Sequence, residues 1–444
     1  MKPNPHVFLS AGEASGDAYG AALISLLRER LPEASFTGLG GSQMEQAGQA
    51  RVVKAEDVAV MGMTEILRHI PRIYASYRRL VVSIRRERPD VAVLIDFPDV
   101  NFRLAKHLRR AGVPVVWFVS PQLWAWKRRR LRWVQERVDK MLVIFPFEER
   151  FYRERGVDAE FVGHPLAETL LPSTPREAYA EVHGLDPAKT WIALLPGSRW
   201  KEIRGNLPVM HELAMSDLIT SSAAYTTFDG STTTQPTDPA AHTRYEFLLP
   251  VASTIDADAL RRYIGELNTE HLKYFGPEAS SLRLTLVPDA AEALFHARAS
   301  VVASGTATVL AAIVGNPFVV VYRVSALTFA LAKKLVKYPE EFAGIEDTAG
   351  NLPVGMVNLI AGRRIVPELL QRQFTAANVA TELGRLLVDG PEREAQIADL
   401  AEVRRKLSGV GPAELARTIS PIERVATAIL TLLNGSNRSV SPKP

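Results

Sequence analysis

The sequence has 444 residues, of which 47% are apolar, 23% charged and 8% aromatic, and it contains no cysteine. Its length predicts two or three globular domains, and the lack of cysteine excludes disulfide scaffolds, thiol nucleophiles, iron–sulfur clusters and cysteine-based zinc sites. The net charge of +4 is a small difference between 53 basic and 49 acidic residues, which argues against a uniformly basic nucleic-acid-binding protein.

The first part of the chain alternates short apolar runs with helical periods. The first run, at 6–10, is too short for a signal peptide. Further continuous apolar runs, typical of strands that are buried on both faces, lie at 91–95, 115–119 and 141–145. Such strands need crossover connections, and helical patterns such as 102–110 can supply them. This alternation predicts that residues 1–165 form a doubly wound α/β domain with a parallel sheet.

A proline-rich segment at 166–189 predicts a hinge, after which the same pattern restarts and continues to residue 370. The apolar runs of this second half lie at 191–195, 247–249, 282–286, 300–303 and 318–322. Two similar α/β halves joined by a hinge predict a cleft, with ligand-binding loops at the carboxyl ends of both sets of strands.

Three further segments complete the predicted organisation. Residues 217–244 are rich in Ser and Thr and predict a flexible surface insertion in the second domain. Helices in 371–434 are expected to pack back on the N-terminal domain, and 435–444 are expected to be a disordered tail. The uncharged stretch 299–322 is long enough to cross a bilayer, but its glycines and polar residues favour a strand, a turn, a buried helix and a second strand.

Two carboxylates follow predicted strands of the first domain. Glu13 lies in the glycine-rich turn 10–17, whose glycines permit close approach of a ligand, although a capping turn with a solvated Glu fits the same residues. Asp96 comes directly after a fully apolar strand, where partial burial can raise the pKa of a carboxyl and make it a general base. For Asp99 and Asn101, which follow in the same motif, capping of the next helix is a sufficient explanation.

The second domain has two strand-to-helix turns that suit phosphate. Gly197 and Ser198 expose backbone amides at a helix start, and Arg199 adds a bidentate donor. The small residues 304–308 precede another helix in the same way. Together these turns predict a pocket for a nucleotide diphosphate, although an Arg near a helix start is common in proteins that bind no phosphate.

Two basic segments with aromatic residues, at 66–88 and 117–133, suit an anionic membrane surface or single-stranded nucleic acid. A core helix with a solvated basic face is the simpler alternative for either segment. Residues 103–155 hold fourteen Lys or Arg against five Asp or Glu, so the small net charge of the chain conceals a strongly basic region. The nine histidines form no metal-binding spacing, and the GxSxG elbow of serine hydrolases is absent.

Several motifs resemble one family. They are AGEASGD at 11–17, VMGMTEIL at 60–67, IDFPDVN at 95–101, SPQLWAWK at 120–127, FPFE at 145–148, FVGHPL at 161–166, LLPGSR at 194–199, SGTAT at 304–308 and VNLIAGRRIVPELLQ at 357–371. In this order they resemble the lipid-A-disaccharide synthases, and the resemblance covers most of the chain.

The resemblance implies a GT-B fold, in which two Rossmann-like domains face a cleft, and an inverting glycosyltransferase. The expected reaction joins UDP-2,3-diacylglucosamine to 2,3-diacylglucosamine 1-phosphate, which gives the lipid A disaccharide 1-phosphate and UDP. We expect no metal and no cofactor. The expected partners are these substrates and the anionic inner-membrane surface, with no nucleic acid and with a homodimer left open. The implied location is the cytoplasmic face of the inner membrane.

The resemblance also implies roles for individual residues. Asp96 is the expected catalytic base, and Glu13 is expected to position the acceptor or the base. The residues expected to bind the UDP donor are Gly197, Ser198, Arg199, Ser304, Gly305, Thr306 and Asn358. Those expected to line the acceptor side are Gly12, Ser15, Gly16, Asp17, Asn101 and Gln122. Those expected at the membrane surface are Leu67, Ile70, Ile73, Trp124, Trp126, Lys127, Arg128, Arg129 and Arg130.

One residue departs from the family pattern. Leu310 comes three residues after the SGTA sequence at 304–307. At this position, in an alignment without gaps, the family usually has a Glu suited to the ribose hydroxyls. Loss of those charged hydrogen bonds is expected to weaken UDP binding, by roughly 1.5 to 3 kcal/mol each. The alternatives are therefore another GT-B enzyme acting on a UDP-sugar, such as an epimerase, or a weakly active or non-catalytic module that binds the membrane surface.

Overall fold

The computed structural model describes residues 4–57, 63–168, 171–215, 225–226, 232–233, 244–275, 284–325, 328–330, 336, 338, 342, 344–346, 350–409 and 419–435. The chain divides into two compact units. Unit 1 comprises Met1–Glu168, Val336–Pro339 and Leu407–Pro444, and unit 2 comprises Thr169–Leu335 and Glu340–Lys406.

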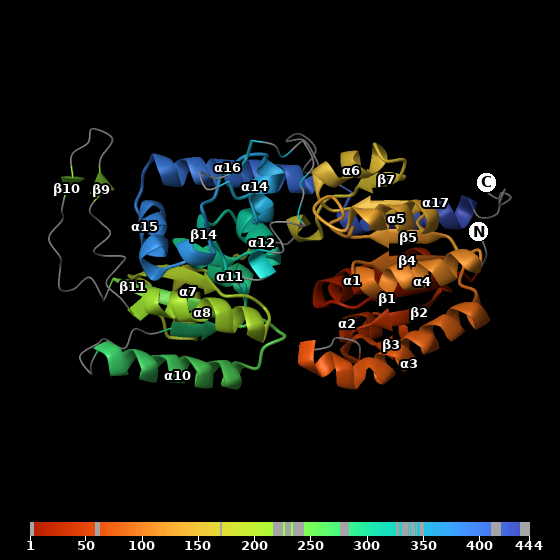
Figure 1. Cartoon of the computed structure of the whole chain (residues 1–444), viewed down its shortest axis with the longest axis horizontal. Coiled ribbons are helices and arrows are strands. Elements are labelled where there is room, and N and C mark those ends of the chain that lie inside the picture. The colour runs from red at the N-terminus through yellow and green to blue at the C-terminus, as the bar shows by residue number, and fades with distance from the viewer. Residues whose placement is uncertain are drawn as a thin grey trace. The chain divides into compact units, whose positions relative to one another are not determined.

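Unit 1 is built on a seven-stranded parallel sheet with the order β3-β2-β1-β4-β5-β6-β7. Its strands are β1 (His6–Ala11), β2 (Ser35–Gly40), β3 (Ala50–Lys54), β4 (Val91–Ile95), β5 (Val115–Phe118), β6 (Lys140–Val143) and β7 (Ala159–Phe161). Its helices are α1 (Ala14–Arg30), α2 (Ser42–Gln46), α3 (Met63–Glu87), α4 (Pro98–Arg110), α5 (Leu131–Arg137), α6 (Pro146–Arg153) and α17 (Pro421–Gly435). Helix α4 contacts α3 and α5, whereas α1 contacts α2 and the returning α17 (Figure 1).

The strand order of unit 1 reverses between β1 and β4. The chain proceeds from β1 to β3 on one side and from β4 to β7 on the other, and Ala11 pairs with Ile95 at the carboxyl ends of the two central strands. All five residues of β4 are buried, as expected for a strand covered on both faces. In open parallel sheets, ligands bind at the point where the order reverses. The loops that begin at Gly12 and Asp96 occupy that point.

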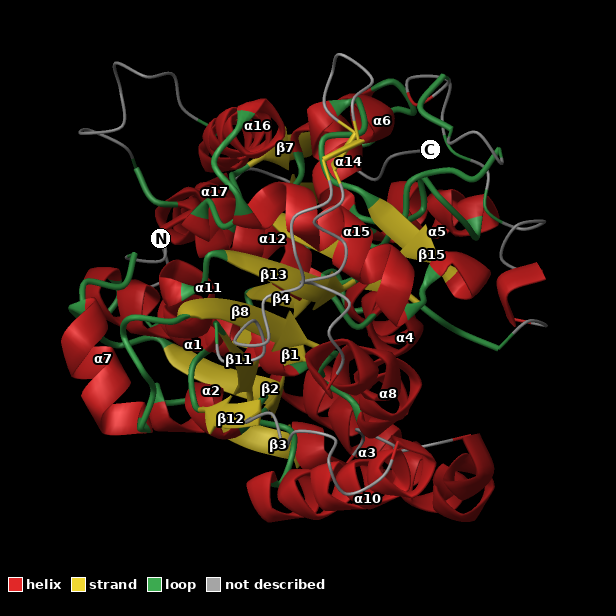
Figure 2. Ribbon diagram, turned by 90° about the vertical axis from the view of Figure 1, so that its left-hand side faces the viewer, coloured by secondary structure: helices red, strands yellow, loops and turns green. Residues whose placement is uncertain are grey.

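Unit 2 has a six-stranded parallel sheet with the order β12-β11-β8-β13-β14-β15, part of which Figure 2 shows in succession. Its strands are β8 (Thr190–Leu195), β11 (Tyr245–Pro250), β12 (Leu284–Val287), β13 (Ala299–Ala303), β14 (Phe318–Tyr322) and β15 (Glu368–Leu370). Its helices are α7 (Arg176–His183), α8 (Trp200–Met215), α10 (Ala257–Phe275), α11 (Ala290–His296), α12 (Thr306–Val314), α14 (Met356–Ala361), α15 (Ala376–Leu387) and α16 (Pro391–Ser408), the last continuing into unit 1. The order reverses between β8 and β13.

The predicted parallel α/β architecture is confirmed, including the interpretation of 299–322 as β13, α12 and β14. Within the described parts of the chain, no helix is both long and apolar enough to cross a bilayer. The short strands β2, β3, β7 and β15 were not predicted. Most of the predicted insertion at 217–244 lies outside the described residues, apart from the paired two-residue strands β9 (Tyr225–Thr226) and β10 (Thr232–Thr233).

The segments expected to form the hinge and the C-terminal helices are divided differently in the structure. Helix α7 falls within the predicted hinge but packs into unit 2, where Tyr179 contacts the rings of Trp191 and His296. Helix α15 buries its apolar face in the core of unit 2, against α8 and β13. Within 371–434, the packing on unit 1 comes from α17 against α1. The burial of each helix follows its own apolar face, which sequence position alone does not determine.

Candidate active site

The loop after β4 holds Asp96 in an unusual backbone conformation. Asp96 and Phe97 have φ angles of +45° and +47°, in the left-handed region that residues other than glycine rarely adopt. Pro98 begins α4 and disfavours a right-handed helical conformation for Phe97. The Asp96 amide donates to the carbonyl of Phe118 at the end of β5, at 2.9 Å. The strained turn presents the half-buried Asp96 side chain at the carboxyl edge of the sheet.

Tyr19 lies near Asp96 and was not predicted as a site residue. Its ring, on α1, lies 6.0 Å from that of Phe118. Burial and, secondarily, the charge of Asp96 raise the pKa of the Tyr19 hydroxyl to about 12. Tyr19 is therefore a neutral hydrogen-bonding group beside the carboxylate at physiological pH.

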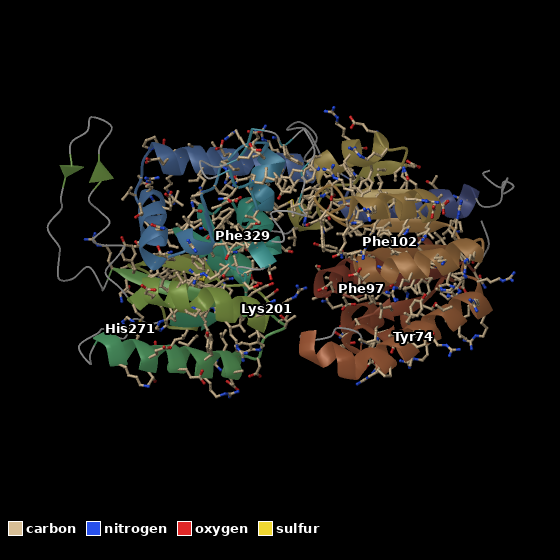
Figure 3. All side chains as sticks on the ribbon, viewed as in Figure 1. Tyr74, Phe97, Phe102, Lys201, His271 and Phe329 are labelled. Atoms are coloured by element: carbon tan, nitrogen blue, oxygen red, sulfur yellow. The ribbon has the colours of Figure 1, made fainter. Side chains whose placement is uncertain are left out.

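The loop after β1 places Glu13 at the start of α1. Glu13 is exposed and occupies the N-cap position, but its side chain makes no capping hydrogen bond. The preceding Gly12 lies under the Phe97 ring, which is labelled in Figure 3, and a Cβ at this glycine would come within 2.4 Å of that ring. Gly12 thus allows the loops that carry Glu13 and Asp96 to pack directly on each other.

Several residues predicted to line the acceptor side have structural roles instead. Asp17 is buried, and its carboxylate accepts hydrogen bonds from the amides of Gly41, Gln43 and Met44 at the start of α2. Gly12 and Gly16 are buried at close packing contacts, and Asn101 is fully buried. Of the predicted acceptor residues, Ser15 and Gln122 are exposed. The side chains of Asp17 and Asn101 already hydrogen-bond to the protein backbone, whereas Gly12 and Gly16 have no polar side chain and lie at packing contacts.

In unit 2, the loop after β8 forms the first predicted phosphate turn. Gly197 has a φ of +128°, which suits glycine, and the exposed Arg199 immediately precedes α8. The Ser198 amide donates to Oε2 of Glu202 at 2.9 Å. A carboxylate of α8 therefore already occupies one of the amides that was predicted to bind phosphate.

The second predicted phosphate turn follows β13, the strand beside β8. Gly305 and Thr306 are exposed at the start of α12, and the Ser304 hydroxyl donates to the carbonyl of Val354 at 3.1 Å. Leu310 lies on α12, one turn after Thr306, and is partly buried. The point at which the strand order of unit 2 reverses is thus flanked by both predicted turns.

Asn358 was expected to bind the donor, but the structure gives its side chain a role in the protein interior. It is fully buried, its Nδ2 donates to Val366 and to Glu368, and its Oδ1 accepts from the amides of Ile365 and Val366. All its hydrogen-bonding capacity is used in holding α14 beside β15. Glu368 also accepts from the Gly355 amide at 2.9 Å, and burial raises the pKa of its carboxyl.

Trp124 was expected at the membrane surface but is 2% exposed. Its indole Nε1 donates to Oε1 of Glu148 at 3.1 Å, and the Ser120 hydroxyl donates to the same oxygen at 2.7 Å. Burial raises the pKa of Glu148 to about 7, against the opposing effect of these hydrogen bonds. The loop 120–126 is therefore anchored by a buried carboxylate that sequence reasoning missed.

The rest of the basic segment remains accessible. Trp126 is 43% exposed, and Lys127 Nζ lies 4.1 Å from the centre of its ring. Lys127, Arg128 and Arg129 are exposed, whereas Arg130 is partly buried and pairs with Asp99 at 2.6 Å. Trp126, Lys127, Arg128 and Arg129 are called the basic surface below.

Helix α3 is amphipathic as predicted, and in its C-terminal half most apolar side chains face the protein. Leu80 and Ile84 are each 1% exposed, and Ile73, two turns before Leu80, is partly buried. Tyr74, labelled in Figure 3, is 59% exposed. The side chains of Leu67 and Ile70 lie outside the described residues. Ile73 is thus neither fully exposed nor fully buried, and its place at a membrane surface stays a prediction.

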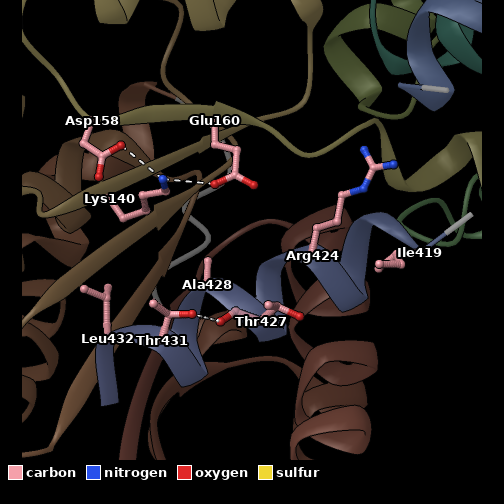
Figure 4. Close-up of a pocket in the computed structure, with 9 residues that line it drawn as sticks. All are labelled: Lys140, Asp158, Glu160, Ile419, Arg424, Thr427, Ala428, Thr431 and Leu432. Carbon is pink, nitrogen blue, oxygen red and sulfur yellow. Dashed lines mark hydrogen bonds and ion pairs between the residues drawn. The ribbon is translucent and has the colours of Figure 1, made fainter. Parts of the chain in front are cut away.

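A cavity of about 280 Å³ in unit 1 lies away from the site loops of that unit (Figure 4). It is found at the amino ends of β6 and β7, whereas Asp96 follows a carboxyl end. Lys140 Nζ lies 3.0 Å from Oδ1 of Asp158 and 3.0 Å from Oε2 of Glu160, so one ammonium is shared by two carboxylates. Among the described residues, no group of three His, Asp or Glu is placed to hold a metal ion.

The residues missed by the sequence reasoning left weak signals. Ser10 interrupts an otherwise apolar strand, and Glu148 lies in the FPFE motif directly after an apolar run. A polar residue in such a setting must find a partner inside the protein. The sequence does not identify that partner, which for Ser10 is Asn101, 91 positions away.

Two doubly wound parallel α/β units, each with polar loops where its strand order reverses, are the architecture of the GT-B fold. A solved structure of a glycosyltransferase of kitacinnamycin has a TM-score of 0.56 to this chain at 14% identity, covering 97% of this chain and 99% of the other. The family model for lipid-A-disaccharide synthetase matches residues 7–226 and 269–415. The chain belongs to the lipid-A-disaccharide synthetase family.

Curated relatives agree with the family model. The lipid-A-disaccharide synthase of Acidobacterium capsulatum is 50% identical over 420 residues, which is 94% of this chain and 95% of that protein. The lipid-A-disaccharide synthase of Koribacter versatilis is 45% identical over 427 residues, covering 96% and 98% of the two chains. The expected family is confirmed, and the epimerase alternative is set aside.

Proposed function

We propose that the chain condenses UDP-2,3-diacylglucosamine with 2,3-diacylglucosamine 1-phosphate, with inversion at the anomeric carbon, to form the lipid A disaccharide 1-phosphate. The observation that carries the proposal is the position of the predicted chemical groups. Asp96 and Glu13 lie where the strand order of unit 1 reverses, and the two phosphate turns lie at the corresponding point of unit 2. Family membership supports the choice of substrates.

In this reaction Asp96 acts as the general base. Its carboxylate takes the proton of the acceptor 6-hydroxyl while the hydroxyl oxygen attacks the anomeric carbon of the donor. The bond from that carbon to the diphosphate oxygen breaks, and UDP leaves with the electron pair. Glu13, exposed at the start of α1, orients the acceptor by accepting hydrogen bonds from its hydroxyl groups. A well-placed base contributes roughly 10²- to 10⁴-fold to the rate.

In unit 2, the exposed Arg199 guanidinium stabilises the charge that develops on the leaving diphosphate. The Glu202 carboxylate holds the Ser198 amide at 2.9 Å, so a phosphate oxygen must displace it to use that donor. Gly305 and Thr306 contribute the start of α12. We propose that these groups suffice for catalysis without a resident metal or cofactor.

The direct test is disaccharide formation from the two acylated substrates by the purified chain, with and without EDTA. We expect turnover with inversion in both conditions, because the proposed machinery consists of protein groups alone. Leu310→Glu, assayed beside the wild type, should bind UDP more tightly through the added carboxylate. Vesicle binding by the wild type without any disaccharide product would favour the non-catalytic alternative, and loss of turnover in EDTA would contradict the metal-free mechanism.

We also propose that the basic surface binds the anionic face of a membrane, which would bring the enzyme to its acylated substrates. Lys127, Arg128 and Arg129 are exposed together, and Trp126 provides an aromatic ring suited to the interface. The attraction is worth about 1 kcal/mol for each Lys or Arg near an anionic surface. A homodimer stays a prediction.

Removing the charge of the basic surface should weaken vesicle binding strongly. The triple variant Lys127→Gln, Arg128→Gln, Arg129→Gln should lose on the order of 10²-fold in affinity for phosphatidylglycerol vesicles, measured by co-sedimentation at low salt. The matched control is Arg150→Gln, Arg153→Gln, Arg155→Gln, which removes the same charge around α6, where these residues pair with Glu149 and Glu154. Equal losses in the two triple variants would mean that overall charge alone governs binding.

A further inference from the structure

The backbone that carries Asp96 is strained. Asp96 and Phe97 both have positive φ angles, a conformation that costs free energy and persists only where the surrounding structure imposes it. Phe97 has a bulky side chain with no intrinsic preference for this region. Some group outside the turn must therefore hold it in place.

Asn101 is one such group. Its Nδ2 donates to the carbonyl oxygen of Asp96 at 2.7 Å, to that of Ile95 at 3.2 Å and to that of Ser10 at 3.3 Å. The side chain comes from the first turn of α4 and reaches back to these three carbonyls. The Asn101 amide therefore stabilises the strained turn through hydrogen bonds to its backbone carbonyls.

The other end of Asn101 is fixed by Ser10. The Ser10 hydroxyl donates to Asn101 Oδ1 at 2.6 Å, and both side chains are completely buried. Ser10 lies on β1 opposite Leu94 of β4, three residues before Glu13. One buried pair thus joins the ends of the two strands from which Glu13 and Asp96 project.

We propose that Ser10 and Asn101 are positioning residues for catalysis, which hold the left-handed turn so that the Asp96 carboxylate faces the reacting hydroxyl. The inference rests on the proposed role of Asp96 as the general base. A buried, hydrogen-bonded polar pair at this edge of the sheet fixes the direction of the Asp96 side chain. Packing of apolar side chains alone would leave that direction variable. Neither residue touches the substrate.

Unit 2 supplies a matched control. Ser300 on β13 donates to Asn316 Oδ1 at 2.5 Å, and Asn316 Nδ2 donates to the carbonyl of Ala297 at 2.8 Å. This pair is also buried, but it lies at the amino ends of β13 and β14, away from the proposed donor loops. Asn316→Ala therefore removes the same chemical interaction without touching the proposed machinery.

The test compares Asn101→Ala with Asn316→Ala by steady-state kinetics and thermal unfolding of the full chain. Both variants should melt at lower temperature. Asn101→Ala should lower kcat on the order of 10²-fold, the size of effect that a misplacement of about 1 Å produces, with little change in KM. Asn316→Ala should leave kcat near the wild-type value. Ser10→Ala retains the three hydrogen bonds from Asn101 to the carbonyls and should lower kcat less than Asn101→Ala. It is the variant to test if Asn101→Ala does not fold.

The double variant Asp96→Asn, Asn101→Ala separates this proposal from that for Asp96. If Asn101 acts through Asp96, adding Asn101→Ala to Asp96→Asn should change the residual kcat little, because residues that act as a unit are not additive. A full second loss would mean that Asn101 acts independently of Asp96, and wild-type kcat in folded Asn101→Ala would also overturn the proposal. Full activity of Asp96→Asn alone would instead refute the assignment of the base.

Discussion

Asp96→Asn should lower kcat by on the order of 10³-fold while leaving UDP affinity unchanged. The amide cannot accept the proton of the acceptor hydroxyl, and removal of a general base costs roughly 10² to 10⁴ in rate. Asparagine tolerates a positive φ as aspartate does, so the strained turn at φ +45° should persist. The proposed UDP groups lie on another unit of the chain. Steady-state kinetics with both acylated substrates, together with calorimetric titration of UDP, measures the two effects.

Asp99→Asn is the control for this experiment. Asp99 lies three residues later, in the first turn of α4, and carries the same charge, but its side chain is 69% exposed and pairs with Arg130. It should retain near-wild-type kcat. Tyr19 does not complicate the pH profile, because its pKa of about 12 keeps it neutral throughout the accessible range. Equal effects of the two substitutions would show that negative charge near the turn, and not proton transfer at Asp96, is what matters.

The strands and the site loops could be predicted because their signals are local. Continuous apolar runs such as 91–95 and 191–195 fit only buried strands, and a polar residue directly after such a run must lie at the carboxyl edge. That reasoning located Asp96 correctly in the fold, and Arg199 lies four residues after its run, immediately before α8. The weak strand β2 escaped it, since Gly38, with a φ of +138°, interrupts an otherwise short apolar pattern.

The inward or outward direction of individual polar side chains could not be predicted. Asp17 binds amides at 41–44, and Asn358 binds groups at 365–368. Trp124 reaches Glu148 across 24 positions. Each pairing depends on how distant segments meet in the fold, so the same residue types in the same motifs fit either a substrate contact or a buried hydrogen bond. The burial of these groups is the main revision that the structure makes to the candidate site.

Glu148→Gln should change the pH dependence of stability of the chain. Burial raises the folded-state pKa of Glu148 from its ordinary 4.5 to about 7, so between these values the folded state holds a proton that the unfolded state has released. The contribution of Glu148 to the free energy of unfolding is therefore greatest below pH 4.5 and falls as the pH rises through 7. The total fall is about 3 kcal/mol, at 1.36 kcal/mol for each pH unit.

Glutamine carries no charge at any pH and removes this term, so the free energy of unfolding of Glu148→Gln should improve relative to wild type between pH 5 and 8. A constant offset is also expected, since the amide can no longer offer an acceptor to both Ser120 and the Phe145 amide, which donates to Oε2 at 3.3 Å. Urea unfolding at several pH values measures the difference in free energy of unfolding between Glu148→Gln and the wild type. The contributions of other titrating groups cancel in this difference. Glu149→Gln, on the same helix but partly exposed and paired with Arg153, should show no comparable trend. A pH-independent difference for Glu148→Gln would mean that the buried carboxyl keeps an ordinary pKa and that the loop 120–126 is anchored by a charged group throughout.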